Sequence, residues 1–482
     1  MRYRSTVIAA LTLLAGCAMG PEFHRPAAPP ADHYTAGTQP EATADTADTA
    51  AGGAGVQRFV SGAPLPARWW ESFHCAPLDA LVAEALAHSP TALEARARLR
   101  QAQADLSAQT GSALYPQVDA QLGATRERVD PAAFGFTNLP QPPPFNLFNA
   151  QVNVSYTLDL LGASRRLIEG ARAQAEYQAY ETQAAQLTLA ANVVAAAIRQ
   201  ADLEAQLDYT RGILAAASRQ LAIAEERYRE GGIALSDLAA QRTQLEQLRA
   251  TLPPLEAQRR AVDHQLAVYT GKPPAAAAVP TFTLTDLTLP GEVPLALPSE
   301  LIERRPDVRA SEALWHQASA NVGVATANLF PHLTISGSLG SERSQASQLV
   351  DGTNVWSVGA NLLQPIFHGG ELQAKRRSAV AAYDAAAAAY EETVLESLQQ
   401  VADSLRVLEA DAPALHARAL AAEQSTASAA IAQQRFDAGG ISEYSLLDAH
   451  RQDLATALDR SHAEAQRLAD TAALMHALNG PL

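Results

Sequence analysis

Four short stretches of the chain alternate between apolar and polar residues. In the clearest of them, residues 151–160, every even position is apolar and every odd position is polar. Residues 117–125, 333–340 and 355–363 follow the same pattern, the last more weakly. A period of two is that of a β-strand with two unlike faces. We therefore predict four strands, arranged as two hairpins with polar loops.

Strands of this length with one apolar and one polar face suit a sheet that crosses a membrane around a wet interior. Four strands cannot close such a sheet alone, because the smallest membrane barrels have about eight. Three copies of the chain would supply about twelve strands, an even number within the known range. Two soluble hairpins packed on other elements are the alternative that the pattern leaves open.

Between the strand pairs the pattern predicts long helices. Residues 162–230 contain no proline, so at about 1.5 Å per residue a continuous helix would be roughly 100 Å long. Residues 371–438 are their counterpart. Over residues 245–269, apolar positions recur at alternating spacings of three and four, which predicts a coiled-coil seam with an antiparallel partner. The proline pair at 253–254 and Pro413 predict a helix break in each hairpin.

The chain contains an internal repeat. Residues 222–233 recur as residues 430–441 with seven of twelve positions identical, at an offset of 208. Residues 89–116 likewise parallel residues 305–331. Such self-similarity indicates a duplicated structural unit. Each unit is predicted to contain a helix, two strands, a long helix, a Gly-Gly turn and a returning helix.

The predicted organisation has five parts. They are a signal peptide at 1–16, a lipidated extended segment at 17–76, a first repeat at 77–280 with its hairpin tip at 231–236, a linker at 281–298, and a second repeat at 299–482 with its tip at 439–442.

The N-terminal residues have the features of an export signal. Arg2 and Arg4 precede an apolar run that ends at Leu14-Ala15-Gly16-Cys17. The run is too short to span a bilayer as a retained helix. Its last four residues match a bacterial lipobox, so we expect cleavage before Cys17 and acylation of Cys17. Cleavage elsewhere, with Cys17 incidental, is the alternative.

Composition narrows the function further. The formal net charge of −15 argues against a nucleic-acid partner. Two cysteines cannot form a disulfide framework, and the twelve histidines show no local zinc-ligand spacing. Nucleotide-binding and nucleophile motifs are also missing from the sequence. We therefore expect no catalytic site, no metal site and no cofactor.

Several blocks together resemble the lipoprotein branch of the TolC-like outer membrane factor family. They are residues 17–26, Trp69–Phe73, residues 297–309 and the Arg-Tyr/Phe-x-x-Gly turns. The resemblance implies an α+β, mainly α, fold. It also implies a homotrimer whose twelve-stranded outer-membrane β-barrel continues into a twelve-helix periplasmic α-barrel. The implied partners are a periplasmic adaptor (membrane fusion) protein, an inner-membrane pump of the RND type, and the lipid of the outer membrane.

The same resemblance suggests functional positions near the two turns. Gly231, Gly232, Gly439 and Gly440 would form hairpin tips that contact the adaptor. Asp448 matches a residue that lines the constricted periplasmic entrance in the family, and Asp237 and Ser445 occupy related gate positions. The alternative for Asp448 is an acidic residue that faces water near the start of a helix, where the helix dipole favours it.

We therefore predict an outer-membrane exit channel that expels small molecules such as drugs from a Gram-negative bacterium. The energy would come from the partner pump. The alternatives are an exit duct for protein secretion, a structural envelope lipoprotein and a lipid-anchored periplasmic enzyme. The four alternating strands argue against a structural tether, and the lack of converging titratable groups argues against an enzyme.

Overall fold

The computed structural model describes residues 18–27, 33–35, 42–43, 57–63, 66–128, 130–131, 135 and 142–478. Contacts divide the chain into two units, neither of which is continuous in sequence. The first comprises Met1–Pro26, Leu99–Gln178 and Ser311–Tyr390, and the second comprises Ala27–Arg98, Ala179–Ala310 and Glu391–Leu482. Each of the two repeats therefore contributes residues to both units.

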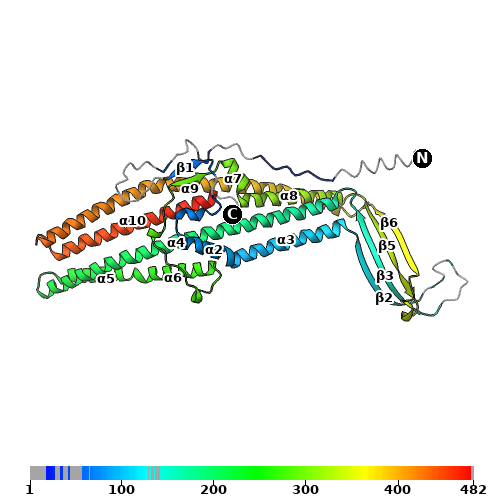
Figure 1. Cartoon of the computed structure of the whole chain (residues 1–482), viewed down its shortest axis with the longest axis horizontal. Helices are drawn as coiled ribbons and strands as arrows, with labels where there is room; N and C mark the ends of the chain where they lie inside the picture. Colours follow the sequence, from blue (N-terminus) through cyan, green and yellow to red (C-terminus); the bar gives the residue numbers. More distant parts are fainter. Residues whose placement is uncertain are drawn as a thin grey trace. The chain divides into compact units, whose positions relative to one another are not determined.

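The first unit contains a four-stranded antiparallel sheet, shown in Figure 1. Its strands, in spatial order, are β2 (Gln117–Glu127), β3 (Phe145–Leu158), β5 (His332–Arg343) and β6 (Val355–Leu363). Pairing of β3 with β5 joins the two repeats, because one strand comes from each half. Within the described part of the chain, β2 and β6 are the edges of the sheet.

The alternating sequence gives the sheet two unlike faces. Opposite residues have matching character, so Val118 pairs with Val154 on the apolar face. On the polar face, the hydroxyl oxygens of Ser338 and Ser357 lie 2.8 Å apart. If one strand were shifted by one residue against its neighbour, every apolar side chain of that strand would move to the polar face. The alternation therefore also specifies the register of the paired strands.

β3 differs from the predicted range of 151–160 at both ends. It begins at Phe145 because residues 145–150 pair with the far end of β2, up to Glu127. It ends at Leu158 because Asp159 turns to the next helix. There its carboxylate accepts hydrogen bonds from the backbone N–H groups of Ser164 and Arg165, at 3.1 and 3.0 Å.

Four helices have residues in both units. They are α3 (Pro90–Leu114), α4 (Ala163–Arg229), α8 (Pro306–Ala327) and α9 (Glu371–Asp437). The second unit also contains α2 (Ala76–His88), α5 (Leu235–Arg249), α6 (Leu252–Tyr269), α7 (Pro298–Arg304) and α10 (Glu443–Leu478). Among the described residues, no helix combines the length and the apolar character that crossing a membrane requires.

The two proline sites behave differently. After α5 ends at Arg249, α6 begins at Leu252, and Pro253 and Pro254 lie in its first turn. The break expected at Pro413 does not occur, because α9 continues through that residue. In the first turn of a helix the backbone N–H groups have no helical partner, so a proline there removes no hydrogen bond. Pro413 lies inside α9, where its missing N–H removes one backbone hydrogen bond of the helix.

The core of the second unit gathers around three aromatic residues. Trp69, Trp70 and Phe73 lie on the short helix η1 (Trp69–Phe73) and are almost fully buried. They belong to one apolar cluster with side chains of α2, α4, α9 and α10. This cluster explains why the Trp-Trp block occurs in an otherwise alanine-rich chain, since alanine alone cannot fill a wide core.

A small parallel sheet in the second unit was not predicted. β1 (Arg58–Ser61) pairs with β4 (Glu292–Leu295), which lies in the segment predicted as a linker. Each strand has only four residues, too few for alternation to be recognised in the sequence. The pairing fastens the N-terminal segment to the link between the repeats.

We predict that Pro413→Ala raises the thermal midpoint of the detergent-solubilised protein. Alanine restores the missing backbone donor, and Pro413 is exposed, so little packing is lost. Pro254→Ala, at an exposed site in the first turn of α6, is the matched control and should change the midpoint little. Scanning calorimetry of both variants measures the difference. An unchanged or lower midpoint for Pro413→Ala would contradict the expectation.

Candidate functional site

The two long helices end in turns of the same geometry. Gly231 and Gly439 have φ angles of +75° and +73°. The N–H of Gly232 donates to the carbonyl of Arg227 over 2.7 Å, and Gly440 makes the equivalent bond. This is the Schellman arrangement, in which a left-handed residue satisfies the last carbonyls of a helix. All four glycines suggested as hairpin tips are exposed.

The suggested gate residues lie close to these turns. Asp448 and Ser445 are one turn apart on α10, and Asp237 lies in the first turn of α5. All three are exposed. The carboxylate of Asp448 accepts a hydrogen bond from Arg451 over 3.2 Å. The i,i+3 spacing of these two residues in the sequence could have revealed this partner, whose positive charge opposes that of the Asp448 carboxylate.

Polar contacts between α4 and α10 hold the two hairpins together beside the turns. The guanidinium of Arg219 donates to both carboxylate oxygens of Glu443, at 2.6 and 2.9 Å. Hydrogen bonding from Arg219 and its charge lower the pKa of Glu443. The hydroxyl of Tyr444 accepts a 2.9 Å hydrogen bond from Gln241 on α5. Sequence reasoning missed these contacts because the partners lie more than 200 residues apart.

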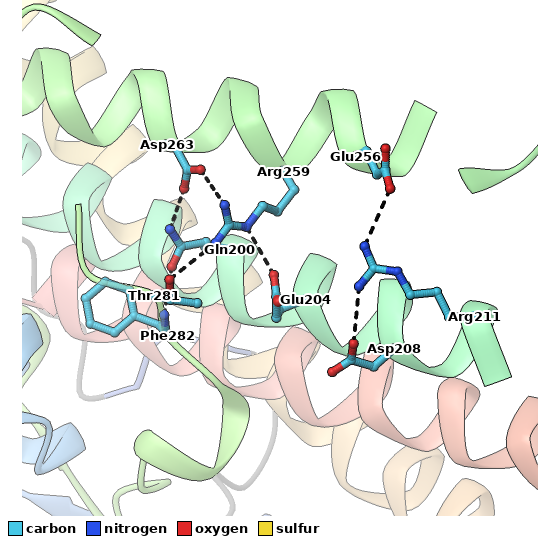
Figure 2. A network of polar contacts seen from close by, with 9 residues as sticks. All are labelled: Gln200, Glu204, Asp208, Arg211, Glu256, Arg259, Asp263, Thr281 and Phe282. Carbon is cyan, nitrogen blue, oxygen red and sulfur yellow. Dashed lines mark hydrogen bonds and ion pairs between the residues drawn. The ribbon is translucent and has the colours of Figure 1, made fainter. Parts of the chain in front are cut away.

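A second polar network joins α4 to α6, as Figure 2 shows. Arg259 is its centre, donating to Glu204 over 3.1 Å and to Asp263 over 2.6 Å. Gln200 donates to the other oxygen of Asp263 and accepts the backbone N–H of Phe282. The expected coiled-coil seam of α6 is therefore partly polar, and it also fixes the segment that follows the first repeat.

Residues 304–307, with the sequence Arg-Arg-Pro-Asp, include a buried arginine that contacts several helices. The Arg305 side chain is 9% exposed and donates to both oxygens of Asp307, at 3.0 and 2.6 Å. It also donates to the carbonyl of Ala477 near the end of α10 and to the side chain of Gln400 on α9. Burial raises the pKa of Asp307, but hydrogen bonds from Arg305 and its charge outweigh burial and lower it. Arg305 thus ties α8, α9 and α10 together.

A cavity of about 1000 Å³ lies between α4, α9, α10 and the short helix η4 (Leu284–Asp286). Alanines from all three long helices line it, together with acidic residues such as Glu204 and Glu464. Arg460 also lines it and donates to Glu464 over 2.8 Å. Alanine keeps this space open, because larger side chains at the same positions would fill it.

The expected lipidation site, Cys17, lies outside the described residues. The segment that follows it is fastened to the first unit. The N–H of Met19 donates to the carbonyl of Leu161 over 3.0 Å, and the Phe23 ring stacks on His316 with centroids 4.6 Å apart. A Cβ on Gly20 would lie 2.4 Å from the backbone of Gly323, so only glycine fits this close approach.

Within the described ranges, no cluster of three or more His, Cys, Asp or Glu side chains is arranged to hold a metal ion. Arg219, Arg259 and Arg305 instead pair with acidic side chains and connect helices.

The family model for outer membrane efflux proteins matches residues 81–272 and 297–480, which is most of the chain. The chain belongs to the outer membrane efflux protein family. These matches confirm the predicted family, which is that of the TolC-like outer membrane factors. They also confirm the α+β, mainly α, fold class and the outer-membrane location.

Curated relatives agree with this assignment. The efflux protein is 31% identical over 386 residues to the pyoverdine export outer membrane protein OpmQ of Pseudomonas aeruginosa, covering 80% of this chain and 81% of OpmQ. It is 30% identical to the outer membrane protein OprJ of the same species, covering 99% and 95%. It is 28% identical to the toluene efflux pump outer membrane protein TtgI of Pseudomonas putida, covering 94% and 93%.

Solved structures show the same fold. The efflux protein superposes on the outer-membrane channel OprN with a TM-score of 0.80 and 26% identity, over 96% of this chain and 99% of that one. For the open state of the MtrE channel of Neisseria gonorrhoeae the TM-score is 0.74 at 23% identity, over 96% and 98%. The protein is therefore an efflux channel component of the outer membrane of a Gram-negative bacterium.

The carboxyl group of Asp411 on α9 lies close to that of Asp470 on α10. Burial and the neighbouring Asp470 raise the pKa of Asp411 from 3.8 to about 6, against the opposing charge of Arg467. Between these two values the folded protein holds a proton that the unfolded chain has lost. Stability from this contact is therefore present at low pH and falls as the pH rises through that window.

We predict that Asp411→Asn weakens this pH dependence, because the amide stays neutral throughout. The thermal midpoint of the wild-type protein should fall more between about pH 4.5 and about pH 7.5 than that of the variant. Asp403→Asn, at an exposed site on the same helix, is the control and should keep the wild-type dependence. Equal pH dependence of wild type and Asp411→Asn in thermal denaturation would refute the assignment.

Proposed function

We propose that three copies of this protein form a passive exit duct for small organic molecules. The observation that carries the proposal is the sheet, which has one apolar face, one polar face and two open edges. In a membrane, unpaired edges are costly, so the strands of several copies must complete one another. Three copies would give about twelve strands around a wet interior, continued by the paired helical hairpins.

The duct would work with a periplasmic adaptor protein and an inner-membrane pump of the RND type, which would supply the energy. The two exposed Gly-Gly turns are the proposed contact with the adaptor, because they are the ends of the hairpins and carry few side chains. The names of the relatives include pyoverdine export and toluene efflux. Both are small organic molecules, which supports this cargo class and not a protein.

The direct test is dye accumulation in cells that keep the adaptor and pump but lack this protein. Supplying the wild-type protein should lower ethidium accumulation. The double variant Gly231→Val, Gly439→Val should not lower ethidium accumulation, because a β-branched residue is strained at positive φ. The matched pair Gly231→Asn with Gly439→Asn should function, since asparagine tolerates this conformation. Unchanged accumulation with the wild-type protein would reject the proposed duct.

Asp448 is the proposed gate residue. Three Asp448 carboxylates around a threefold axis would attract cations to the mouth, with Arg451 as a partial counter-charge. In planar bilayers, Asp448→Ala should lower cation selectivity and divalent block and raise conductance. Asp437→Ala, on the other side of the same turn, is the control. If all three quantities match the wild type in Asp448→Ala, this carboxylate does not form the gate.

Cys17 is the proposed lipidation site. Intact-mass analysis of the mature protein should give a chain that begins at an acylated Cys17, with more than one acyl chain for stable anchoring. Cys17→Ser should lose the lipid and release more protein from the membrane. Cys75→Ser, at the buried free cysteine of the second unit, should keep the lipid. A mature N-terminus at another residue would exclude this role for Cys17.

A further inference from the structure

The charged side chains of the large sheet are sorted by sign between its two faces. Within the four described strands, the two arginines, Arg126 on β2 and Arg343 on β5, both lie on the apolar face. The acidic side chains of the same strands, Asp119, Glu127 and Glu342, all lie on the polar face. A charge on a lipid-facing strand is costly away from the membrane boundary. The depth at which the two arginines lie is therefore informative.

Both arginines lie at the loop end of the sheet, opposite the end where the helices join it. α3 leads into β2 and α8 leads into β5, and Arg126 and Arg343 lie at or next to the last residues of these strands. Arg126 is opposite Asn146 and Arg343 is opposite Phe148, so their levels differ by two residues of β3. With strands about 4.8 Å apart and a rise of about 3.3 Å per residue, the two Cα atoms are about 12 Å apart.

The loop end lies at the height expected for the boundary of a bilayer. The apolar face of β5 runs from Leu333 to Arg343, about 33 Å along the strand at about 3.3 Å per residue. For a strand tilt of about 40° this length gives a height of about 25 Å, which is that of the apolar band in membrane-spanning sheets. Phe148 and Trp356 lie on the same face and supply aromatic side chains typical of such a boundary.

Neither arginine is neutralised by an acidic side chain of the described residues. Arg126 is exposed, and its guanidinium donates a long hydrogen bond of 3.4 Å to the amide oxygen of Asn146. Arg343 is partly exposed and has no acidic partner in the described part of the chain. At the helix end, by contrast, Arg165 forms an ion pair with Asp159 over 3.2 Å. The loop end therefore presents two positive charges beside an apolar surface.

We propose that Arg126 and Arg343 bind the phosphate groups of lipid A, the phosphorylated glycolipid of the outer leaflet of the outer membrane. The proposal rests on the proposed function in one respect, because the loop end faces the outer leaflet only if the helices extend into the periplasm. A guanidinium group can hold a phosphate with two parallel hydrogen bonds. The acyl chains would then lie along the apolar face, against side chains such as Leu122 and Val358, which are 81% and 75% exposed.

The sorting of charges by face follows from this assignment. Carboxylates on the apolar face would repel the lipid phosphates, and in the described strands they lie on the other face. Arginine is costly at the middle of a bilayer and nearly neutral at its boundary, where both arginines lie. The long side chain of arginine also lets its charge extend past the apolar band to the headgroups. Charge sign and depth thus both fit a lipid surface that carries phosphates.

Native mass spectrometry of the full-length protein in detergent, titrated with bis-phosphorylated lipid A, tests this proposal. Arg126→Gln with Arg343→Gln should weaken lipid A binding by about 25-fold, because each arginine at an anionic surface contributes about fivefold. Arg376→Gln with Arg377→Gln removes the same charge from exposed positions on α9 and should bind lipid A as the wild type does. Arg126→Lys with Arg343→Lys keeps the charge and should restore most of the affinity that glutamine removes.

Three results would overturn the proposal. They are equal affinity of the wild type and the glutamine variant of Arg126 and Arg343 for lipid A, equal affinity of the wild type for lipid A without phosphates, and displacement of lipid A by an equal concentration of inorganic phosphate. The double variants should keep the wild-type thermal midpoint, which separates lost binding from misfolding. The measurement needs neither adaptor nor pump, so its failure is distinct from a failure of the duct in the ethidium test.

Discussion

Backbone hydrogen bonding at the edges of the sheet is the constraint on which the rest of this structure depends. Within the described residues, the large sheet has four two-faced strands, and its edge strands β2 and β6 each have one row of N–H and C=O groups without a neighbouring strand. Such groups cannot remain unpaired in lipid. The duplication reduces the problem without solving it, because it joins two hairpins through β3 and β5 but leaves one edge at each side. The sheet of one chain therefore has two open edges.

The helices are held together by a different combination of interactions, with little apolar burial and several charged contacts. They are rich in alanine, which allows close approach but buries little apolar area per residue. Among the described residues, the cluster around Trp69, Trp70 and Phe73 forms a broad core. Elsewhere, charged residues with several partners connect the helices, with Arg305 and Arg259 as the clearest examples. Their planar guanidinium groups can bond several elements at once, which lysine cannot do as well.

Local signals in the sequence were enough to predict the strands, the long helices and the Gly-Gly turns. Each depends on neighbouring residues, as the positive φ of Gly231 and Gly439 illustrates. The contact of Arg219 with Glu443 could not be predicted, because nothing local distinguishes these two residues from other exposed charges. The start of β3 at Phe145 was missed for a related reason, since pairing with β2, and not alternation, extends it.

Equal lengths in the two repeats have an evolutionary consequence. The spans from Gly162 to Gly231 and from Gly370 to Gly439 contain the same number of residues, and α4 and α9 each have 67. An insertion or deletion in one span alone would displace the Gly-Gly turn at its end. Each added or removed residue would translate that turn by about 1.5 Å along the helix axis and rotate it by about 100° around the axis. Length changes in such a gene should therefore be accepted in matched pairs, or should fall in segments outside the long helices, such as the strand loops.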